Sequence, residues 1–557
     1  MTITSTRSPP DGALLRDIHS ALAKNEVDRA TSLAEAALMA GQEDALLLNL
    51  TAHRREIEGR YPAAMALLNR ALRLTPNDPY ILNNFAGVLS KAGRPREALV
   101  LFDAALGVEP NFVLAHHGRG LALAALGDTA NAWTAHARAN ALDPNYPDPL
   151  GALAALAAEG GDYAVARSLA RRALTLDPGQ VAATLSLATV ALHEGHYVDV
   201  IDDVGKLLAA TSLPALDLAA AERLRAGALD AMDRYDEAMS AYRSANRSLR
   251  SLYMQGVEES GVELGVELCA RLGDHFKTAP PGWRAPPRTP PVTRGGIVEH
   301  IFLLGFHRSG TTLLEQVLAT HPDISALEER PTLDPILHHY FADEAALDRL
   351  ANLDGDDLKR ERENYWKRVD LFDVDTTKRV FIDKMPLSTI YLPLIAKLFP
   401  SSKIILALRD PRDVVVSCFR HNFRASTLVV EYTDLMRTAR LYDGVMKLAD
   451  LYRGALPLPF YVHRHESLVE DFDTEARALC DFLNVTWRDD LRDFVATAQR
   501  RNIHTPSVNQ VRRGLYREGM GQWRRYRSHL KDVLPVLEPW VERFGYPSTD
   551  DPIAPES

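Results

Sequence analysis

The stretch Ile301-Phe302-Leu303-Leu304-Gly305-Phe306-His307-Arg308-Ser309-Gly310-Thr311-Thr312 decides how the C-terminal half of the chain folds. Its first four residues are apolar and predict a buried strand, and residues 313–319, which follow it, predict a helix. A strand, a tight loop and a helix N-terminus bring loop amides and the positive end of the helix dipole together, and this arrangement binds anions. We therefore expect an anion-binding site at residues 305–312.

The two glycines of this loop have the spacing of the nucleoside triphosphatase P-loop, Gly-x-x-x-x-Gly. A P-loop continues with a Lys that reaches the β- and γ-phosphates, and this chain has Thr311 at that position. The loop is therefore expected to hold a phosphate-like group without supporting ordinary ATP hydrolysis.

The composition is that of an ordinary globular protein. With 557 residues the chain is expected to form roughly two to four domains. The formal net charge of -10 argues against a general nucleic-acid binder. Three cysteines, Cys269, Cys418 and Cys480, lie far apart and match no metal spacing, so we expect reduced structural thiols and no metal. The polar residues 1–12 lack a secretory apolar region, and no apolar run approaches about 20 residues, so we expect a cytoplasmic protein without a membrane span.

A 34-residue period runs through the N-terminal half. Three kinds of residue keep this step: Pro76, Pro110, Pro144 and Pro178; Gly59, Gly93, Gly127, Gly161 and Gly195; and two alanine series, Ala30, Ala64, Ala98, Ala132 and Ala166, then Ala37, Ala71, Ala105, Ala139 and Ala173. The period and the residue types indicate tetratricopeptide repeats, each a pair of helices, and residues 11–252 accommodate about seven pairs. Asn25 and Asp233 are expected to take the glycine place in atypical end repeats.

The repeats are expected to form a solenoid whose concave groove binds an extended peptide or protein segment. A scaffold that only stabilises the chain or makes it a homodimer is the alternative. Residues 253–276 predict a capping helix, and the prolines within 277–296 predict an extended linker. Residues 297–545 then form the second domain.

This second domain alternates short apolar runs with longer helical segments. The runs are at 297–304, 379–382, 403–408 and 459–463, and the alternation predicts a parallel α/β sheet with helices on both faces. Ligands of such folds bind beyond the carboxyl ends of the strands. Three runs end in polar residues of interest: the loop at 305–312, Asp383-Lys384, and Arg409.

Several motifs occur in order along this domain. They are His307 to Leu313, His321-Pro322, Glu328-Glu329, and Leu408-Arg409-Asp410-Pro411-Arg412-Asp413 with Ser417. With the repeats, they make the chain resemble the tetratricopeptide-repeat-containing sulfotransferases, in the tyrosylprotein sulfotransferase-like branch of the enzymes that use 3'-phosphoadenosine 5'-phosphosulfate (PAPS). The resemblance covers residues 297–535 and implies a P-loop-like sulfotransferase domain, PAPS as the donor, no metal, and an acceptor hydroxyl.

The resemblance favours tyrosine of a peptide or protein as the acceptor. Carbohydrate, lipid or small phenolic acceptors stay open as alternatives. Two hypotheses from other functional classes also stay open. One is a degenerate P-loop nucleotide kinase or ATPase that uses Asp383 and Mg²⁺, and the other is a nucleotide-binding repeat adaptor without catalysis.

The resemblance also implies roles for individual residues. The catalytic residues are Glu329, as the base that deprotonates the acceptor, with Arg308 and Lys384, which balance developing charge. The residues that bind the 5'-phosphosulfate are Arg308, Ser309, Gly310, Thr311 and Thr312, and the 3'-phosphate is held by Arg409 and Ser417. Glu328 is the fallback base, and His307 and His421 are minor rivals. The adjacent carboxylates of Glu328 and Glu329 are expected to raise the pKa of one of them.

The second nucleotide motif predicts a helix with its own cap. Asp410 is expected as the N-cap, Pro411 as the first helical residue and Asp413 as the partner in a box-like arrangement. Arg412 is expected either to contact the nucleotide or to lie solvated on the helix.

The C-terminal part resembles the cofactor lid of the family, at residues 505–511, at Gly521-Gln522-Trp523 and at Tyr526. Arg512, Arg513 and Arg517 are expected to close over the phosphates or to form an exposed cationic face. The chain departs from the family twice, with Gln522 in place of a basic residue and His465 in place of a Tyr.

Overall fold

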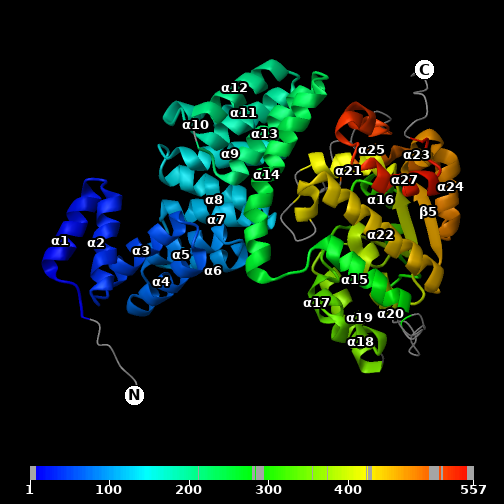
Figure 1. Cartoon of the computed structure of the whole chain (residues 1–557), viewed down its shortest axis with the longest axis horizontal. Helices are drawn as coiled ribbons and strands as arrows, with labels where there is room; N and C mark the ends of the chain where they lie inside the picture. The colour runs from blue at the N-terminus through cyan, green and yellow to red at the C-terminus, as the bar shows by residue number, and fades with distance from the viewer. Residues whose placement is uncertain are drawn as a thin grey trace. The chain divides into compact units, whose positions relative to one another are not determined.

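A computed structural model of the chain describes residues 8–210, 212–278, 283, 294–353, 355–372, 374–421, 423, 429–500, 514–515 and 519–548. The chain divides into two compact units, Met1–Met232 and Asp233–Ser557 (Figure 1). The boundaries expected at residues 252, 276 and 296 stay predictions, and most of the expected Pro-rich linker lies outside the described residues. Within the described part of the chain, no helix is long and apolar enough to span a bilayer.

The first unit is a stack of antiparallel helices (Figure 1). Its helices are α1 (Gly12–Ala23), α2 (Val27–Met39), α3 (Ala45–Ile57), α4 (Tyr61–Leu74), α5 (Pro79–Lys91), α6 (Pro95–Val108), α7 (Val113–Leu126), α8 (Thr129–Leu142), α9 (Pro147–Glu159), α10 (Tyr163–Leu176), α11 (Val181–His193), α12 (Tyr197–Ala210) and α13 (Ala215–Ala231). The predicted solenoid of helix pairs is confirmed.

The repeating residues have the roles that their chemistry predicts. Both alanine series are buried, with exposed fractions of at most 5%, where only a methyl group allows two helices to approach closely. The five glycines all have a positive φ between paired helices, and Asn25 and Asp233 share it at φ 59°. These two residues therefore do take the glycine place. Asp44, Asp78, Asp128 and Asp162 cap helices by accepting backbone amides.

The second unit contains the sheet. Its elements are α14 (Tyr235–Ser260), α15 (Gly265–Thr278), β1 (Glu299–Gly305), α16 (Thr311–Ala319), β2 (Ile324–Glu328), α17 (Asp334–Phe341), α18 (Glu344–Ala351), α19 (Gly355–Val369), β3 (Val380–Lys384), η2 (Pro386–Tyr391), α20 (Leu392–Leu398), β4 (Lys403–Leu408), α21 (Pro411–Arg420), η3 (Val429–Thr433), α22 (Leu435–Ala455), β5 (Phe460–Arg464), α23 (His465–Glu470), α24 (Phe472–Phe482), η4 (Asp489–Asp493), α25 (Phe494–Arg500), η6 (Gln522–His529) and α27 (Leu534–Arg543), where η marks a 3₁₀ helix. Helix α14 runs through residue 252 without a break and packs against α21, η3 and η6.

The sheet has the order β2-β3-β1-β4-β5 with all neighbours parallel, as the alternation of apolar runs predicts. The four predicted apolar runs correspond to strands β1, β3, β4 and β5. Strand β2 was not predicted, because Ile324–Glu328 is short and contains Ser325. The register pairs Gly305 with Ala407, and Glu328 with Lys384. The carboxyl ends of the strands therefore meet at one edge.

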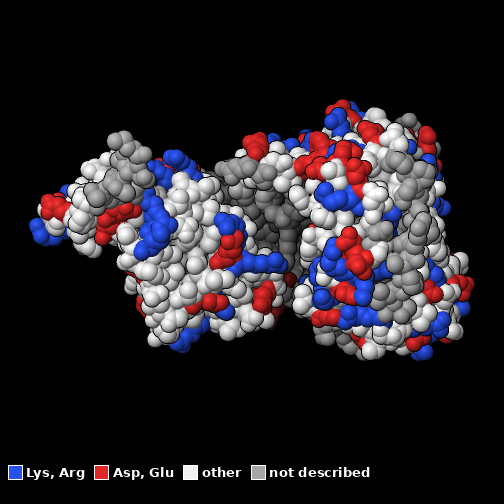
Figure 2. Space-filling model, turned by 90° about the horizontal axis from the view of Figure 1, so that it is seen from below, with Lys and Arg blue, Asp and Glu red and all other residues white. Residues whose placement is uncertain are grey.

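Helices cover both faces of this sheet. On one face, Ile301, Leu303 and Ile405 pack against apolar residues of α16 and α24. On the other face, the rings of Phe302 and Phe381 contact aromatic residues of α19 and the end of α20. Burial of alternate residues on opposite faces fixes the strand register, and with it the edge where the loops emerge. Figure 2 shows Lys and Arg interspersed with Asp and Glu on the visible surface, so both signs share that face.

Candidate functional site

The loop after β1 has a backbone that only particular residues tolerate. Gly310 has φ 85° and ends the loop as the N-cap of α16. A Cβ at this position would lie 2.4 Å from Nδ1 of His465, so the site accepts only glycine. Arg308 has φ 67°, a strained conformation for a residue with a side chain. Such strain, next to the N-terminus of α16, is typical of a ligand-binding loop.

Arg308 of this loop lies beside Arg409, the residue that follows β4. Arg308 Nε donates to Ser417 Oγ at 3.0 Å, and Arg409 Nη1 donates to the carbonyl oxygen of Arg308 at 3.2 Å. Both arginines are 8% exposed. Burial, and next the charge of Arg409, lower the pKa of Arg308 to about 10. Two buried guanidinium groups of like charge, one of which destabilises the charge of Arg308, form a site that an anion would stabilise.

One hydrogen-bond donor of Arg409, its buried Nε, has no partner among the described residues. The Nη2 of Arg409 donates to the carbonyl oxygen of Gly519. No carboxylate in the described part of the chain lies within ion-pair distance of Arg409. The structure thus brings together Arg308, Arg409 and Ser417. Arg308 and Ser417 are separated by 109 residues in the sequence.

Glu329 and Lys384 form the second part of the site. Lys384 Nζ is 3.0 Å from Glu329 Oε1, and the Lys384 side chain is fully buried while that of Glu329 is 28% exposed. Burial alone would raise the pKa of Glu329, but Lys384, His307 and Arg308 lower it by more, so its pKa lies below the ordinary value. The expectation of a raised pKa is therefore wrong for Glu329, because a lysine and not a second carboxylate dominates its surroundings.

Lys384 also contacts Glu315, a residue that the sequence interpretation missed. Glu315 Oε2 lies 3.2 Å from Lys384 Nζ, and the Glu315 side chain is fully buried on α16. Its only sequence signal is that it is the single charged residue of α16. The carboxylates of Glu315 and Glu329 raise the pKa of Lys384 although burial opposes them.

His307 lies beside this pair and is held by Tyr432. His307 Nδ1 and the Tyr432 hydroxyl are 2.7 Å apart. Burial lowers the pKa of His307 and raises that of Tyr432 well above its ordinary value. His421 has its Nδ1 2.8 Å from the carbonyl oxygen of Ser417, one turn back on α21. Glu329 is part of the charge environment of His307.

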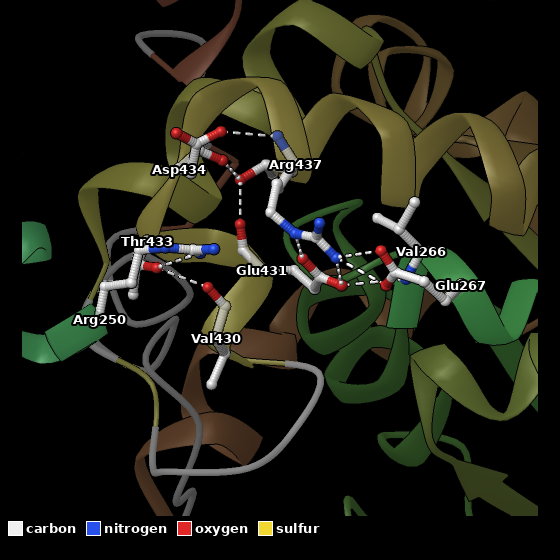
Figure 3. A network of polar contacts seen from close by, with 9 residues as sticks. Arg250, Val266, Glu267, Val430, Glu431, Thr433, Asp434 and Arg437 are labelled. Atoms are coloured by element: carbon white, nitrogen blue, oxygen red, sulfur yellow. Dashed lines mark hydrogen bonds and ion pairs between the residues drawn. The ribbon is translucent and has the colours of Figure 1, made fainter. Parts of the chain in front are cut away.

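A polar network fixes the segment that carries Tyr432 (Figure 3). Figure 3 shows Arg437 of α22 reaching the carboxylates of Glu431 and Glu267, with Nη2 of Arg437 2.9 Å from Glu431 Oε1 and 2.7 Å from Glu267 Oε2. The fully buried Glu431 also accepts the Val266 amide at 3.0 Å. The network therefore ties η3 to α15 and α22, and so sets the place of Tyr432 against His307.

The start of α21 differs in part from its prediction. Asp410 accepts the Arg412 amide and Pro411 opens the helix, as predicted. The box-like role of Asp413 is wrong, because Asp413 accepts the amides of Gly521 at 2.6 Å and Trp523 at 2.8 Å instead. The solvated alternative for Arg412 is also wrong, since this side chain is fully buried and pairs with Asp410 at 2.7 Å.

The C-terminal residues attach to the same helix. Arg412 lies over the Trp523 ring at 4.1 Å, and Gln522 Oε1 accepts from Arg420 at 3.1 Å. Arg420 thus brings a guanidinium to Gln522, the position at which the family carries a basic residue. Tyr526 is fully buried. Residues 505–511, Arg512, Arg513 and Arg517 lie outside the described residues.

His465, the second departure, lies buried at the loop. It begins α23 and packs against Gly310, and burial together with Arg409 holds its pKa well below the ordinary value. Its Nδ1 is buried without a hydrogen-bond partner in the described part of the chain. A neutral imidazole with an open nitrogen therefore faces the loop in place of a phenol.

The comparisons with known proteins agree with this geometry. Residues 300–489 match the sulfotransferase family, and residues 15–79, 57–118 and 152–210 match tetratricopeptide repeats. An uncharacterized protein of Aquifex aeolicus is 30% identical over 261 residues, which are 45% of this chain and 33% of that protein, so the match spans a third of that relative's length. Protein-tyrosine sulfotransferase 1 of Danio rerio is 25% identical over 44% of this chain and 72% of its own.

Protein-tyrosine sulfotransferase A of Caenorhabditis elegans is 23% identical over 45% of this chain and 68% of its own. A solved tetratricopeptide repeat protein from Parabacteroides merdae covers 42% of this chain and 92% of its own at 17% identity and a TM-score of 0.34. The loop after β1 and both partners of the Glu329–Lys384 pair lie within the residues that match the family. This chain is therefore a tetratricopeptide-repeat protein that carries a sulfotransferase-family domain.

Proposed function

We propose that this protein moves a sulfuryl group from PAPS to an acceptor hydroxyl, and that the acceptor is a tyrosine of a peptide or protein. The observation that carries the proposal is the meeting of two groups of residues at one sheet edge. The buried pair Arg308 and Arg409 supplies positive charge, and the partly exposed Glu329 supplies a carboxylate beside it. The named tyrosine sulfotransferase relatives support the choice of acceptor.

The residues of the loop suit the phosphate groups of the donor. The amides at the start of α16, with the Thr311 and Thr312 hydroxyls, would hold the 5'-phosphosulfate, and Arg308 would balance charge on the leaving phosphate. Arg409 and Ser417 would hold the 3'-phosphate, which the unpaired Nε of Arg409 favours. When bound, the donor supplies the sulfuryl group, whose bond to the phosphate oxygen breaks as the bond to the acceptor oxygen forms.

Glu329 would take the proton of the acceptor hydroxyl. Its side chain is the exposed member of the pair with Lys384, so an acceptor reaches it from solvent. Lys384 would stabilise negative charge on the group in transfer. A carboxylate with a lowered pKa is ionised at neutral pH and therefore ready to accept a proton, although it is a weak base.

The contacts of Asp383 argue against the kinase alternative. Its Oδ2 accepts from the Tyr365 hydroxyl at 2.6 Å and from Thr332 Oγ1 at 3.0 Å. Successive residues of a strand point to opposite faces, so Asp383 faces α19 while Lys384 faces Glu329. A Walker-B carboxylate would need to face the phosphate loop.

The test is a transfer assay with the full chain, PAPS and a library of tyrosine-containing peptides, with carbohydrate, lipid and phenolic acceptors in parallel. We expect sulfated tyrosine, and thermal stabilisation by adenosine 3',5'-bisphosphate. Glu329→Gln should lower kcat by about 10³-fold, the range of a lost general base, while nucleotide binding is kept. Glu328→Gln is the matched control and should stay active.

Three outcomes would change the proposal. Transfer to none of the acceptors, with no stabilisation by the nucleotide, overturns the sulfotransferase activity. Transfer only to carbohydrate, lipid or phenol replaces tyrosine as the acceptor. Full activity of Glu329→Gln with loss in Glu328→Gln moves the base to the neighbouring residue.

We also propose that the repeat unit guides the peptide. Exposed apolar side chains lie on helices of this unit, with exposed fractions of 57% for Tyr80, 48% for Leu114 and 49% for Leu121. Apolar side chains on a solenoid are typical anchors for an extended segment.

A further inference from the structure

Lys384 is shared between two carboxylates of different exposure. Its ammonium lies 3.2 Å from Glu315 Oε2 and 3.0 Å from Glu329 Oε1. The side chains of Glu315 and Lys384 are fully buried, whereas that of Glu329 is 28% exposed. The acceptor can therefore reach Glu329, and Glu315 is closed off behind the lysine.

Glu315 is not needed to complete the packing of α16. The neighbouring Leu314, Val317 and Leu318 are buried in the apolar core under the sheet. A buried carboxylate loses its hydration and stabilises a fold only through its partners, so an apolar residue at position 315 would serve packing alone. Besides Lys384, Glu315 contacts the Gln316 side chain, whose Nε2 donates to Oε1 at 3.2 Å. The contact with Lys384 gives the buried charge at position 315 an oppositely charged partner.

The charge balance changes when Glu329 takes a proton. Before transfer, one ammonium is shared by two carboxylates. After transfer, Glu329 is neutral, and without Glu315 the buried Lys384 ammonium would keep only Glu328 of the three carboxylates that raise its pKa. With Glu315 present, Lys384 keeps a counter-charge through the whole step, and an unpaired buried charge is avoided.

We propose that Glu315 is a positioning residue for the transfer step: its carboxylate holds the Lys384 ammonium at the site and shares it with Glu329, which leaves Glu329 able to accept the proton. The role of Glu329 as base rests on the proposed function, while the hold of Glu315 on Lys384 does not.

The first test is the pH profile of Glu315→Gln in the full chain. Loss of a negative charge beside Lys384 and near Glu329 favours the ionised form of Glu329 and the neutral form of Lys384, so both pKa values fall. We expect the acid and alkaline limbs of the kcat profile to move to lower pH by about one unit, the size of a neighbouring-charge effect. Glu329 stays ionised at neutral pH but becomes a weaker base, so kcat on the plateau should fall by at most about tenfold per unit of pKa.

Two variants separate this role from a loss of folding. Glu315→Asp keeps the charge and should restore the positions of both limbs. Glu361→Gln removes another buried carboxylate, 6% exposed on α19 and paired with Arg360, and should leave both limbs in place. A merely structural role for Glu315 would lower the active fraction without moving the limbs, and that result overturns the proposal.

The second test does not depend on activity. The titration of the Lys384 ammonium is followed by NMR in protein labelled with ¹³C at lysine Cε, with the signal assigned by Lys384→Arg. The Lys384 pKa should be lower in Glu315→Gln than in the wild type, and equal values overturn the proposal. If the wild type transfers sulfate to no acceptor, the proposed function fails, and this titration still decides whether Glu315 holds the lysine.

Discussion

At the residue scale, the site depends on charges that are buried before any ligand arrives. Arg308 and Arg409 are both buried, and the charge of one lowers the pKa of the other. The fold holds these like charges together because Arg308 donates to Ser417 and Arg409 donates to backbone carbonyls. Residues in such an unfavourable charge state are typical of binding sites. Their identities were predicted from sequence, but their mutual contact was not.

Arg409 should discriminate nucleotides by the 3'-phosphate. In Arg409→Met, the affinity for adenosine 3',5'-bisphosphate should fall by about 2 kcal/mol, the typical value of a hydrogen bond to a charged group. The affinity for adenosine 5'-phosphate should change little. Calorimetry with both nucleotides measures the difference, and Arg453→Met, on the outer part of α22, is the control. Equal losses for the two nucleotides would contradict the assignment to the 3'-phosphate.

At the element scale, the geometry of the site is set where each element ends. β1 gives way to the loop at Gly305, β2 and β3 end beside each other at Glu328 and Lys384, and β4 ends one residue before Arg409. Parallel register places these ends at one edge. The loop then needs glycine at position 310, because α23 presents His465 against it.

Gly310→Ala should disable this loop. The added methyl would meet His465, and its φ of 85° adds about 1 kcal/mol of backbone strain for a residue with a Cβ. We expect stabilisation by adenosine 3',5'-bisphosphate to be lost in a thermal shift assay. Gly310→Ala combined with His465→Ala removes the collision but not the strain, so it should recover binding in part. Unchanged binding in Gly310→Ala would show that the loop does not contact the nucleotide.

Asp383 at the end of β3 should make stability depend on pH. Burial raises its pKa from 3.8 to about 6. Between these values the unfolded state loses the proton while the folded state keeps it, so stability falls as pH rises through this window. Above about pH 6 the full penalty is present, about 3 kcal/mol for a rise of about two units.

Asp383→Asn should therefore flatten the dependence. Urea unfolding at pH 4 and pH 7, followed by tryptophan fluorescence, measures it, since every tryptophan except Trp133 belongs to the second unit. Asp413, whose pKa burial also raises to about 6, contributes in the same window. An Asp383→Asn variant as pH-dependent as the wild type would contradict the raised pKa.

At the scale of the whole molecule, the two units differ in how far apart in sequence their contacting residues lie. The repeat unit has local contacts between successive helices, while the second unit joins residues far apart, such as Arg308 and Ser417. Helix α14 follows the repeats in sequence and packs within the second unit. The repeats offer exposed apolar side chains, and the second unit offers the charged site.

Leu121→Asp should separate these two contributions. An exposed residue of α7 can change without loss of folding, so transfer to a small phenol should be kept. If the repeat unit guides the acceptor, kcat/KM for a long peptide should fall about tenfold, the effect of losing an anchor worth about 1.4 kcal/mol. Glu97→Lys, on the exposed surface of α6, is the charge control. A parallel loss for phenol and peptide would contradict guidance by the repeats.

The sequence alone determined the repeat architecture, the loop after β1 and the residues at the strand ends, because these depend on local patterns: a 34-residue period, apolar runs and glycine spacing. It missed β2, since a strand of five residues carries too little pattern. It also missed Glu315, and it predicted the wrong partner for Asp413, because both side chains bond to residues distant in sequence. Tertiary structure decided the pKa of Glu329, since burial and the charge of Lys384 arise only when β2, β3 and α16 pack together.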